Sequence, residues 1–98
     1  MYKVDFTKQA VKDAKLIENA GLKNNTGKII SVVRKNPFQS PPPFEALRGD
    51  RKGAYSRRIN RQHRFVYEVL PNLEHLKDEN DELYQGIVKI IRMWTHYE

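Results

Sequence analysis

The chain has 98 residues, of which 39% are hydrophobic and 10% aromatic, so residues 1–98 are expected to form one domain around a single core. It contains no cysteine, which excludes disulfides and thiolate chemistry and fits a cytoplasmic location. No apolar run approaches the roughly 18 residues of a membrane span, and the first residues lack the apolar core of a secretion signal, so no membrane partner is expected. The net charge of +6 favours an acidic partner, most often nucleic acid.

The first residues predict a strand followed by a helix. Tyr2, Val4 and Phe6 alternate with polar residues, which is the period of a strand. Thr7 is a suitable N-cap, and apolar residues then recur at helical spacing up to Ala20.

The stretch after Gly21 predicts a second helix. It is expected to begin near Asn25 or Thr26 and to end at Asn36, because Pro37 disfavours helical backbone in the residue before it. The β-branched residues of this stretch would also suit a strand, and that alternative stays open. Two successive amphipathic helices can lie together on one face of a sheet.

A hairpin between residues 54 and 70 is the feature around which the rest of the chain is organised. Its strands alternate in polarity, and the turn between them is polar. One face of the first strand carries Tyr55, Arg57 and Ile59, and one face of the second carries Phe65, Tyr67 and Val69. These apolar side chains need a core, whereas Arg58 and Arg64 on the other positions need anions or water.

The remaining segments complete the predicted fold. Residues 37–44 form an extended, proline-stiffened connector, and residues 71–82 form a polar, acidic connection at the tip of a longer hairpin. A last strand from Tyr84 to Trp94 has apolar residues on both faces, as in a central strand. The order strand, helix, helix and three strands predicts an α+β fold with an antiparallel sheet and a two-helix layer on one face.

Positive charge is concentrated before and within the hairpin. Residues 48 to 64 include a single acid, Asp50, and seven cations. The cations are Arg48, Arg51, Lys52, Arg57, Arg58, Arg61 and Arg64. Because the acids of residues 74–82 form a separate stretch, the segregation indicates a phosphate-binding surface, although many small basic proteins bind no acidic partner.

Four residues can converge on one site if this sheet forms: Glu45, Arg58, Arg64 and His96. A carboxylate, two guanidiniums and an imidazole suit metal-free RNA cleavage. A base takes the proton of the ribose 2′-OH, that oxygen attacks the adjacent phosphorus, and an acid protonates the leaving 5′-oxygen. Arginine suits stabilisation of the phosphorane, because it stays charged and binds phosphate with paired hydrogen bonds.

Each of these residues also has a simpler interpretation. Glu45 can be a solvated loop carboxylate, and His96 can be an exposed residue near the end of the chain. Arg58 and Arg64 can form ion pairs with acids across the strands, and Tyr97 can close the edge of the core. Composition and spacing alone favour nucleic-acid binding and leave catalysis open.

Several motifs occur along the chain in a specific order. They are Pro37-Phe38, Glu45-Ala46-Leu47-Arg48, Ser56-Arg57-Arg58-Ile59, His63-Arg64-Phe65-Val66-Tyr67 and the terminal His96-Tyr97. In this combination the chain resembles the YoeB/Txe family, toxins of bacterial type II toxin–antitoxin modules within the RelE superfamily. The resemblance spans most of the chain and is strongest between residues 37 and 69.

The resemblance implies a ribosome-dependent endoribonuclease, an mRNA interferase that cleaves mRNA in the A site without a metal or cofactor and so inhibits translation. It implies that Glu45 is the general base, His96 the general acid and Arg64 the main phosphate stabiliser. Arg58 would assist at the phosphate, and Tyr97 would orient the substrate.

The resemblance also implies partners beyond mRNA. Contact with RNA and the ribosome would involve Arg48, Arg51, Lys52, Arg57 and Arg61. A cognate antitoxin protein and a homodimer are further expected partners. Two rival functions share much of this sequence pattern, a ParE-like gyrase-inhibiting toxin and a non-catalytic ribosome- or RNA-binding protein. The joint presence of Glu45, Arg64 and His96 favours the nuclease over both.

Overall fold

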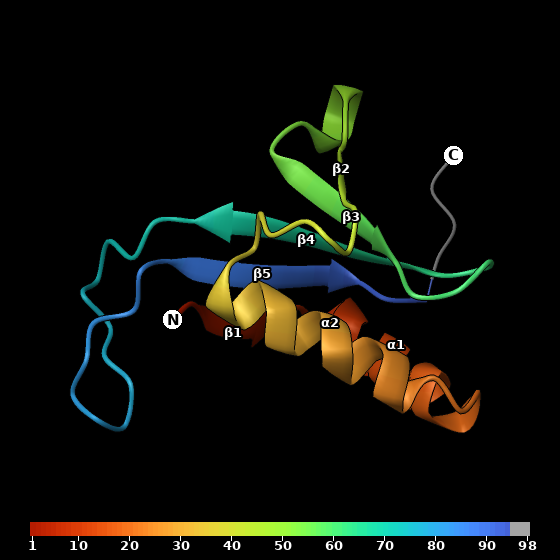
Figure 1. Cartoon of the computed structure of the whole chain (residues 1–98), viewed down its shortest axis with the longest axis horizontal. Coiled ribbons are helices and arrows are strands. Elements are labelled where there is room, and N and C mark those ends of the chain that lie inside the picture. Colours follow the sequence, from red (N-terminus) through yellow and green to blue (C-terminus); the bar gives the residue numbers. More distant parts are fainter. Residues whose placement is uncertain (95–98) are drawn as a thin grey trace.

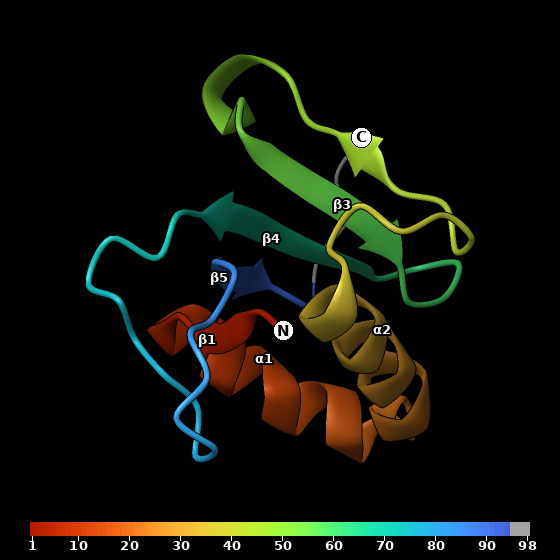
Figure 2. The same cartoon turned by 60° about the vertical axis from the view of Figure 1, so that its left-hand side comes forward.

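The computed structural model describes residues 1–94, which form two helices and one five-stranded sheet (Figure 1). The elements are β1 (Lys3–Phe6), α1 (Lys8–Asn19), α2 (Lys23–Lys35), β2 (Glu45–Ala46), the 3₁₀ helix η1 (Gly49–Arg51), β3 (Ala54–Arg58), β4 (Arg64–Leu70) and β5 (Ile87–Arg92). Both helices lie on the same side of the sheet in Figures 1 and 2. The predicted α+β fold with a two-helix layer on one face is confirmed.

The strands follow the order β1-β5-β4-β3-β2 across the sheet. Every neighbouring pair is antiparallel except β1 and β5, which are parallel. The predicted hairpin is the β3–β4 pair, in which Arg58 lies opposite Arg64. Figure 2 shows β2 along the outer edge of β3, a two-residue strand that the sequence did not predict. β5 lies between β1 and β4, as its apolar residues on both faces predicted.

The helix boundaries follow local capping signals. The Thr7 hydroxyl accepts a hydrogen bond from the Ala10 N–H at 3.1 Å, which satisfies one of the free donors at the start of α1. After α1 the chain turns at Gly21, whose φ of 75° is accessible to glycine at little cost. α2 begins at Lys23, slightly before the predicted start, and ends before Asn36 as expected. The alternative of a strand in this stretch is therefore wrong.

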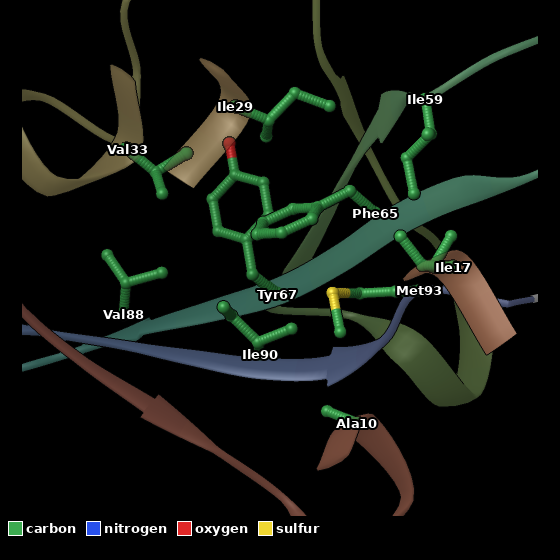
Figure 3. Close-up of a cluster of buried hydrophobic side chains, with 10 residues drawn as sticks. All are labelled: Ala10, Ile17, Ile29, Val33, Ile59, Phe65, Tyr67, Val88, Ile90 and Met93. Carbon is green, nitrogen blue, oxygen red and sulfur yellow. The ribbon is translucent and has the colours of Figure 1, made fainter. Parts of the chain in front are cut away.

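The core fills the space between the helices and the sheet (Figure 3). Its buried side chains are Ala10, Ile17, Ile29, Val33, Ile59, Phe65, Tyr67, Val88, Ile90 and Met93. Full burial of a large apolar side chain contributes roughly 1.5–3 kcal/mol, so β4 and β5, which both supply such side chains, are firmly held. The site described below lies on the opposite face of this anchored sheet.

The connection between β4 and β5 is mostly exposed and is closed by one bridge between Lys77 and Leu83, as expected for the tip of a long hairpin. β5 itself is shorter than the predicted strand from Tyr84 to Trp94. Neither helix in residues 1–94 combines the length and the apolar character needed to cross a lipid bilayer.

Candidate active site

The strand register brings three predicted site residues onto one face of the sheet. Glu45 of β2 lies opposite Ser56 of β3, and Arg58, two residues further along β3, lies opposite Arg64 of β4. Directly paired residues and residues two apart share a face, so these four side chains project from the same side. That side faces away from the helices, because the alternate positions of β4, such as Tyr67, point into the core (Figure 3).

Glu45, Arg58 and Arg64, with Pro43, line a pocket of about 300 Å³. The Arg64 Nη2 atom lies 3.4 Å from the Glu45 Oε1 atom. The Glu45 side chain is 72% exposed, whereas that of Arg64 is 17% exposed. An ion pair this long and this open to water contributes little to stability, so an incoming anion can displace the carboxylate at low cost.

A hydrogen bond within the sheet orients Arg64. Its Nε atom donates to the Ser56 Oγ atom at 2.6 Å, and Ser56 is fully buried. Charge-assisted hydrogen bonds of this kind are short and comparatively strong. The guanidinium is therefore held at one edge, while its Nη2 atom is directed toward Glu45.

Arg58 places a second positive charge in the pocket. It is exposed, and among the described residues it has no salt-bridge partner. Like charges at directly opposite strand positions repel, so the Arg58–Arg64 pair is unfavourable without an anion nearby. A phosphate between the two guanidiniums would relieve this repulsion. Among the described residues that line this pocket, the ion pair is the one between Arg64 and Glu45.

Arg57 differs from its prediction as an RNA contact. It is 1% exposed, and its guanidinium donates to the backbone oxygens of Pro37, Gln39 and Pro42 and to the Tyr67 hydroxyl. The prediction is corrected because a side chain with its donors committed inside the protein presents no charge to RNA. Arg57 instead holds the connector that leads into β2, the strand that carries Glu45.

The other cations predicted to contact RNA lie on the surface. Arg48, Arg51, Lys52 and Arg61 are all exposed, in the segment around η1 and in the turn between β3 and β4. They flank β3 in the chain, with Arg48, Arg51 and Lys52 before it and Arg61 after it.

Asp13 on α1, on the other side of the sheet from the pocket, is a buried residue that the sequence did not single out. It is 1% exposed, and its Oδ2 atom accepts hydrogen bonds from Arg92, Met93 and Trp94 at the end of β5. Burial raises the pKa of Asp13, but hydrogen bonds from the Met93 backbone, Gln9 and Arg92 outweigh it and hold the pKa below its usual value. An ionised carboxylate on α1 therefore anchors the chain as it leaves β5.

A second contact, between aromatic rings, holds Trp94 at the end of the described chain. The Trp94 ring stacks on the ring of His63, with centroids 3.8 Å apart and planes inclined by 20°. The predicted site residues His96 and Tyr97 follow directly in the sequence and lie outside the described residues. Within residues 1–94, His, Asp and Glu side chains form no group of three or more that could hold a metal ion.

Comparison with known proteins gives consistent matches. Residues 6–97 match a family model described as a YoeB-like toxin of bacterial type II toxin-antitoxin system. A solved YoeB/ParE toxin from Agrobacterium tumefaciens is 26% identical, with 97% of this chain and 99% of that chain covered and a TM-score of 0.78. A YoeB-YefM complex from Staphylococcus aureus is 26% identical, with 99% of both chains covered and a TM-score of 0.69. YafQ from Escherichia coli, 17% identical with 98% and 94% covered and a TM-score of 0.69, shares the fold. No curated protein matches the chain.

Proposed function

Because the chain belongs to the YoeB-like toxins of bacterial type II toxin–antitoxin systems, we propose that it is a ribosome-dependent endoribonuclease that cleaves mRNA in the ribosomal A site and inhibits translation. The observation that carries this proposal is the pocket in which Glu45, Arg58 and Arg64 meet. A carboxylate beside two guanidiniums supplies a base and phosphate stabilisation in one place. The site of action would be the cytoplasm, where ribosomes are found.

In the proposed reaction, the Glu45 carboxylate takes the proton of a ribose 2′-OH. The 2′-oxygen attacks the adjacent phosphorus, the bond to the 5′-oxygen breaks, and the products are a 2′,3′-cyclic phosphate and a 5′-OH. The high exposure of Glu45 leaves it accessible to a nucleotide held by the ribosome. General base catalysis contributes a factor of about 10² to 10⁴ in rate.

The two arginines stabilise the phosphorane that forms during this attack. Arg64 is the main contributor, because its hydrogen bond to Ser56 orients it before the substrate arrives. Arg58 adds a second charge from the opposite position of the hairpin. We assign His96 as the acid that protonates the 5′-oxygen and Tyr97 as a residue that orients the substrate.

The proposal includes macromolecular partners. Arg48, Arg51, Lys52 and Arg61 would contact ribosomal RNA through phosphates, an interaction that weakens as salt rises. A cognate antitoxin protein would neutralise the toxin, as the Staphylococcus aureus relative was solved together with YefM. A homodimer of this chain is a further proposed assembly.

Primer extension on a defined mRNA in a purified translation system tests the proposal. Wild type should produce discrete cuts at the A-site codon only when ribosomes are present. Glu45→Ala, Arg64→Ala and His96→Ala should each weaken the cuts by about 100-fold or more, leaving a slow residual rate. Lys77→Ala, in the exposed connection between β4 and β5, should leave them unchanged. Stalled translation without cuts, equal in wild type and variants, would instead identify a non-catalytic ribosome-binding protein.

A ParE-like gyrase inhibitor is the second candidate, because the Agrobacterium tumefaciens relative is described as a YoeB/ParE toxin. Such a toxin has no need of Glu45, Arg64 and His96 together. Its toxicity would survive their substitution, leave translation intact and be accompanied by DNA damage.

A further inference from the structure

The buried guanidinium of Arg57 ties the proline-rich connector to the sheet. Its Nη2 atom donates to the backbone oxygens of Pro37 at 3.0 Å and Gln39 at 2.8 Å, and its Nη1 atom donates to that of Pro42 at 2.6 Å. The Nε atom donates to the Tyr67 hydroxyl at 3.0 Å. Four of the five guanidinium hydrogens are thus used, three of them on one short segment of backbone.

Tyr67 on β4 completes this arrangement. Its hydroxyl accepts from Arg57 and donates to the Pro37 oxygen at 2.7 Å. Burial raises the pKa of Tyr67, although the hydrogen bond from Arg57 opposes the rise, so the hydroxyl keeps the proton that it donates. Pro37 is therefore held by two donors from two neighbouring strands.

Aromatic rings close the other sides of the Arg57 guanidinium. Its central carbon lies 5.0 Å from the centroid of the Phe44 ring, a cation–π distance. Phe44 in turn contacts Phe38 and Tyr55, with ring centroids 6.2 and 5.9 Å away. The connector, yellow in Figure 2 where it rises from α2 toward β3, is thus held by side chains of β3 and β4 at Pro37, Gln39 and Pro42.

We propose that Arg57 is a positioning residue that sets the place of Glu45 in the pocket. Only Pro43 and Phe44 separate Glu45 from the carbonyl of Pro42 that Arg57 holds. β2, the strand that carries Glu45, has two residues, both exposed, so its own pairing with β3 supplies little restraint. Within residues 1–94, the Glu45 side chain makes a single ion pair, the long one with Arg64, so the position of its backbone decides where the carboxylate lies.

We call the hydrogen bonds from Arg57 to the backbone oxygens of Pro37, Gln39 and Pro42 the clamp. Only arginine has the donor geometry to form it. Its planar fork reaches acceptors on several sides at once, whereas the three donors of a lysine radiate from one nitrogen. Arg57→Lys should hold the connector at fewer points, and Arg57→Met should keep the packing of the stem without holding any. The inference rests on the proposed function, since the position of Glu45 matters for rate only if Glu45 is the base.

A double-mutant cycle distinguishes positioning from a merely structural role. Single-turnover cleavage at saturating toxin would be compared for wild type, Arg57→Met, Glu45→Ala and the double variant. Arg57→Met should slow cleavage by about 10- to 100-fold, since a displacement of about 1 Å can cost this much. The loss of cleavage rate caused by Glu45→Ala should then be about 10- to 100-fold smaller in the Arg57→Met background than in wild type, because the base is already displaced.

Two controls make the cycle specific. Arg58→Ala should slow cleavage by the same factor in both backgrounds, because Arg58 is carried by β3 and not by the connector. Ile17→Ala, which removes core packing on α1, should leave the rate per folded molecule unchanged. An undiminished Glu45→Ala effect in the Arg57→Met background would overturn the positioning role. If Arg57→Met does not fold, Tyr67→Phe replaces it, because it removes the hydroxyl between Arg57 and Pro37.

Amide hydrogen exchange tests the clamp without reference to cleavage. In Arg57→Met, the backbone amides of Gln39, Ser40 and residues 44–47 should exchange faster, including the Leu47 N–H that donates to the Ala54 oxygen, while α1 amides stay protected. Unchanged exchange in the connector would overturn the clamp even if the wild type cuts mRNA. Faster exchange with a wild type that never cuts mRNA would instead overturn the proposed nuclease, and with it the role of Arg57 in positioning a base.

Discussion

The carboxylate of Asp13 on α1 accepts a hydrogen bond from the backbone N–H of Met93, 2.9 Å away, just beyond the end of β5. The same oxygen accepts from Arg92 at 3.0 Å and from the Trp94 N–H at 3.2 Å. We expect Asp13→Asn to lower the free energy of unfolding by about 1–3 kcal/mol, because a neutral amide replaces a charged acceptor and leaves buried donors poorly paired. Urea denaturation at neutral pH measures the change. Lys77→Ala, which breaks only the exposed pair with Asp81, should leave stability unchanged.

The stabilisation by Asp13 should depend on pH in a defined direction. Burial raises the pKa of Asp13, but its hydrogen bonds prevail, so the folded-state pKa lies below the ordinary value of 3.8. A depressed pKa stabilises the fold fully above the unfolded value and less as pH falls through the folded one. The stability difference between wild type and Asp13→Asn should therefore be constant from neutral pH down to about pH 5 and shrink below about pH 4. A stability difference that is the same at pH 2 as at pH 5 would contradict this assignment.

Ser56 offers a way to disturb Arg64 without removing its charge. Because the Ser56 hydroxyl accepts from the Arg64 Nε atom, Ser56→Ala should leave the guanidinium free to rotate. We expect about a tenfold loss of the single-turnover cleavage rate, equivalent to the roughly 1.4 kcal/mol of one hydrogen bond to a charged group. In an Arg64→Ala background the same substitution should have no further effect. A full additional loss there would mean that Ser56 acts on the reaction by another route.

Local sequence signals were sufficient for the order of the elements. Thr7, Gly21 and Pro37 mark helix ends by capping and by backbone restriction, and these effects operate within a few residues. The two-residue strand β2 and the parallel pairing of β1 with β5 depend on register between distant segments. No periodicity in either stretch carries that information.

Arg57 was expected to contact RNA because it is charged, but it is buried in the structure. It alternates with Ser56 and Arg58 and shares its face with Tyr55 and Ile59, so the strand period places it on the core side. A charge on an apolar face predicts a buried, partnered group, and Asp13 falls on the apolar stripe of α1 in the same way. Their partners could not be predicted, because the Pro37 oxygen lies 20 residues from Arg57 and the Met93 N–H lies 80 residues from Asp13.

The exposed cations around the pocket should control ribosome binding through phosphates. We expect Lys52→Ala and Arg61→Ala each to weaken binding and to reduce the slope of log affinity against log salt by roughly 0.7 to 0.9, the value for one phosphate contact. Sedimentation with ribosomes over a range of salt concentrations measures both quantities. Arg57→Lys should leave the slope unchanged, because Arg57 is buried and its charge faces backbone oxygens. A slope reduced in Arg57→Lys as much as in Lys52→Ala would show that Arg57 reaches RNA in the bound state, which the geometry of the free protein does not allow.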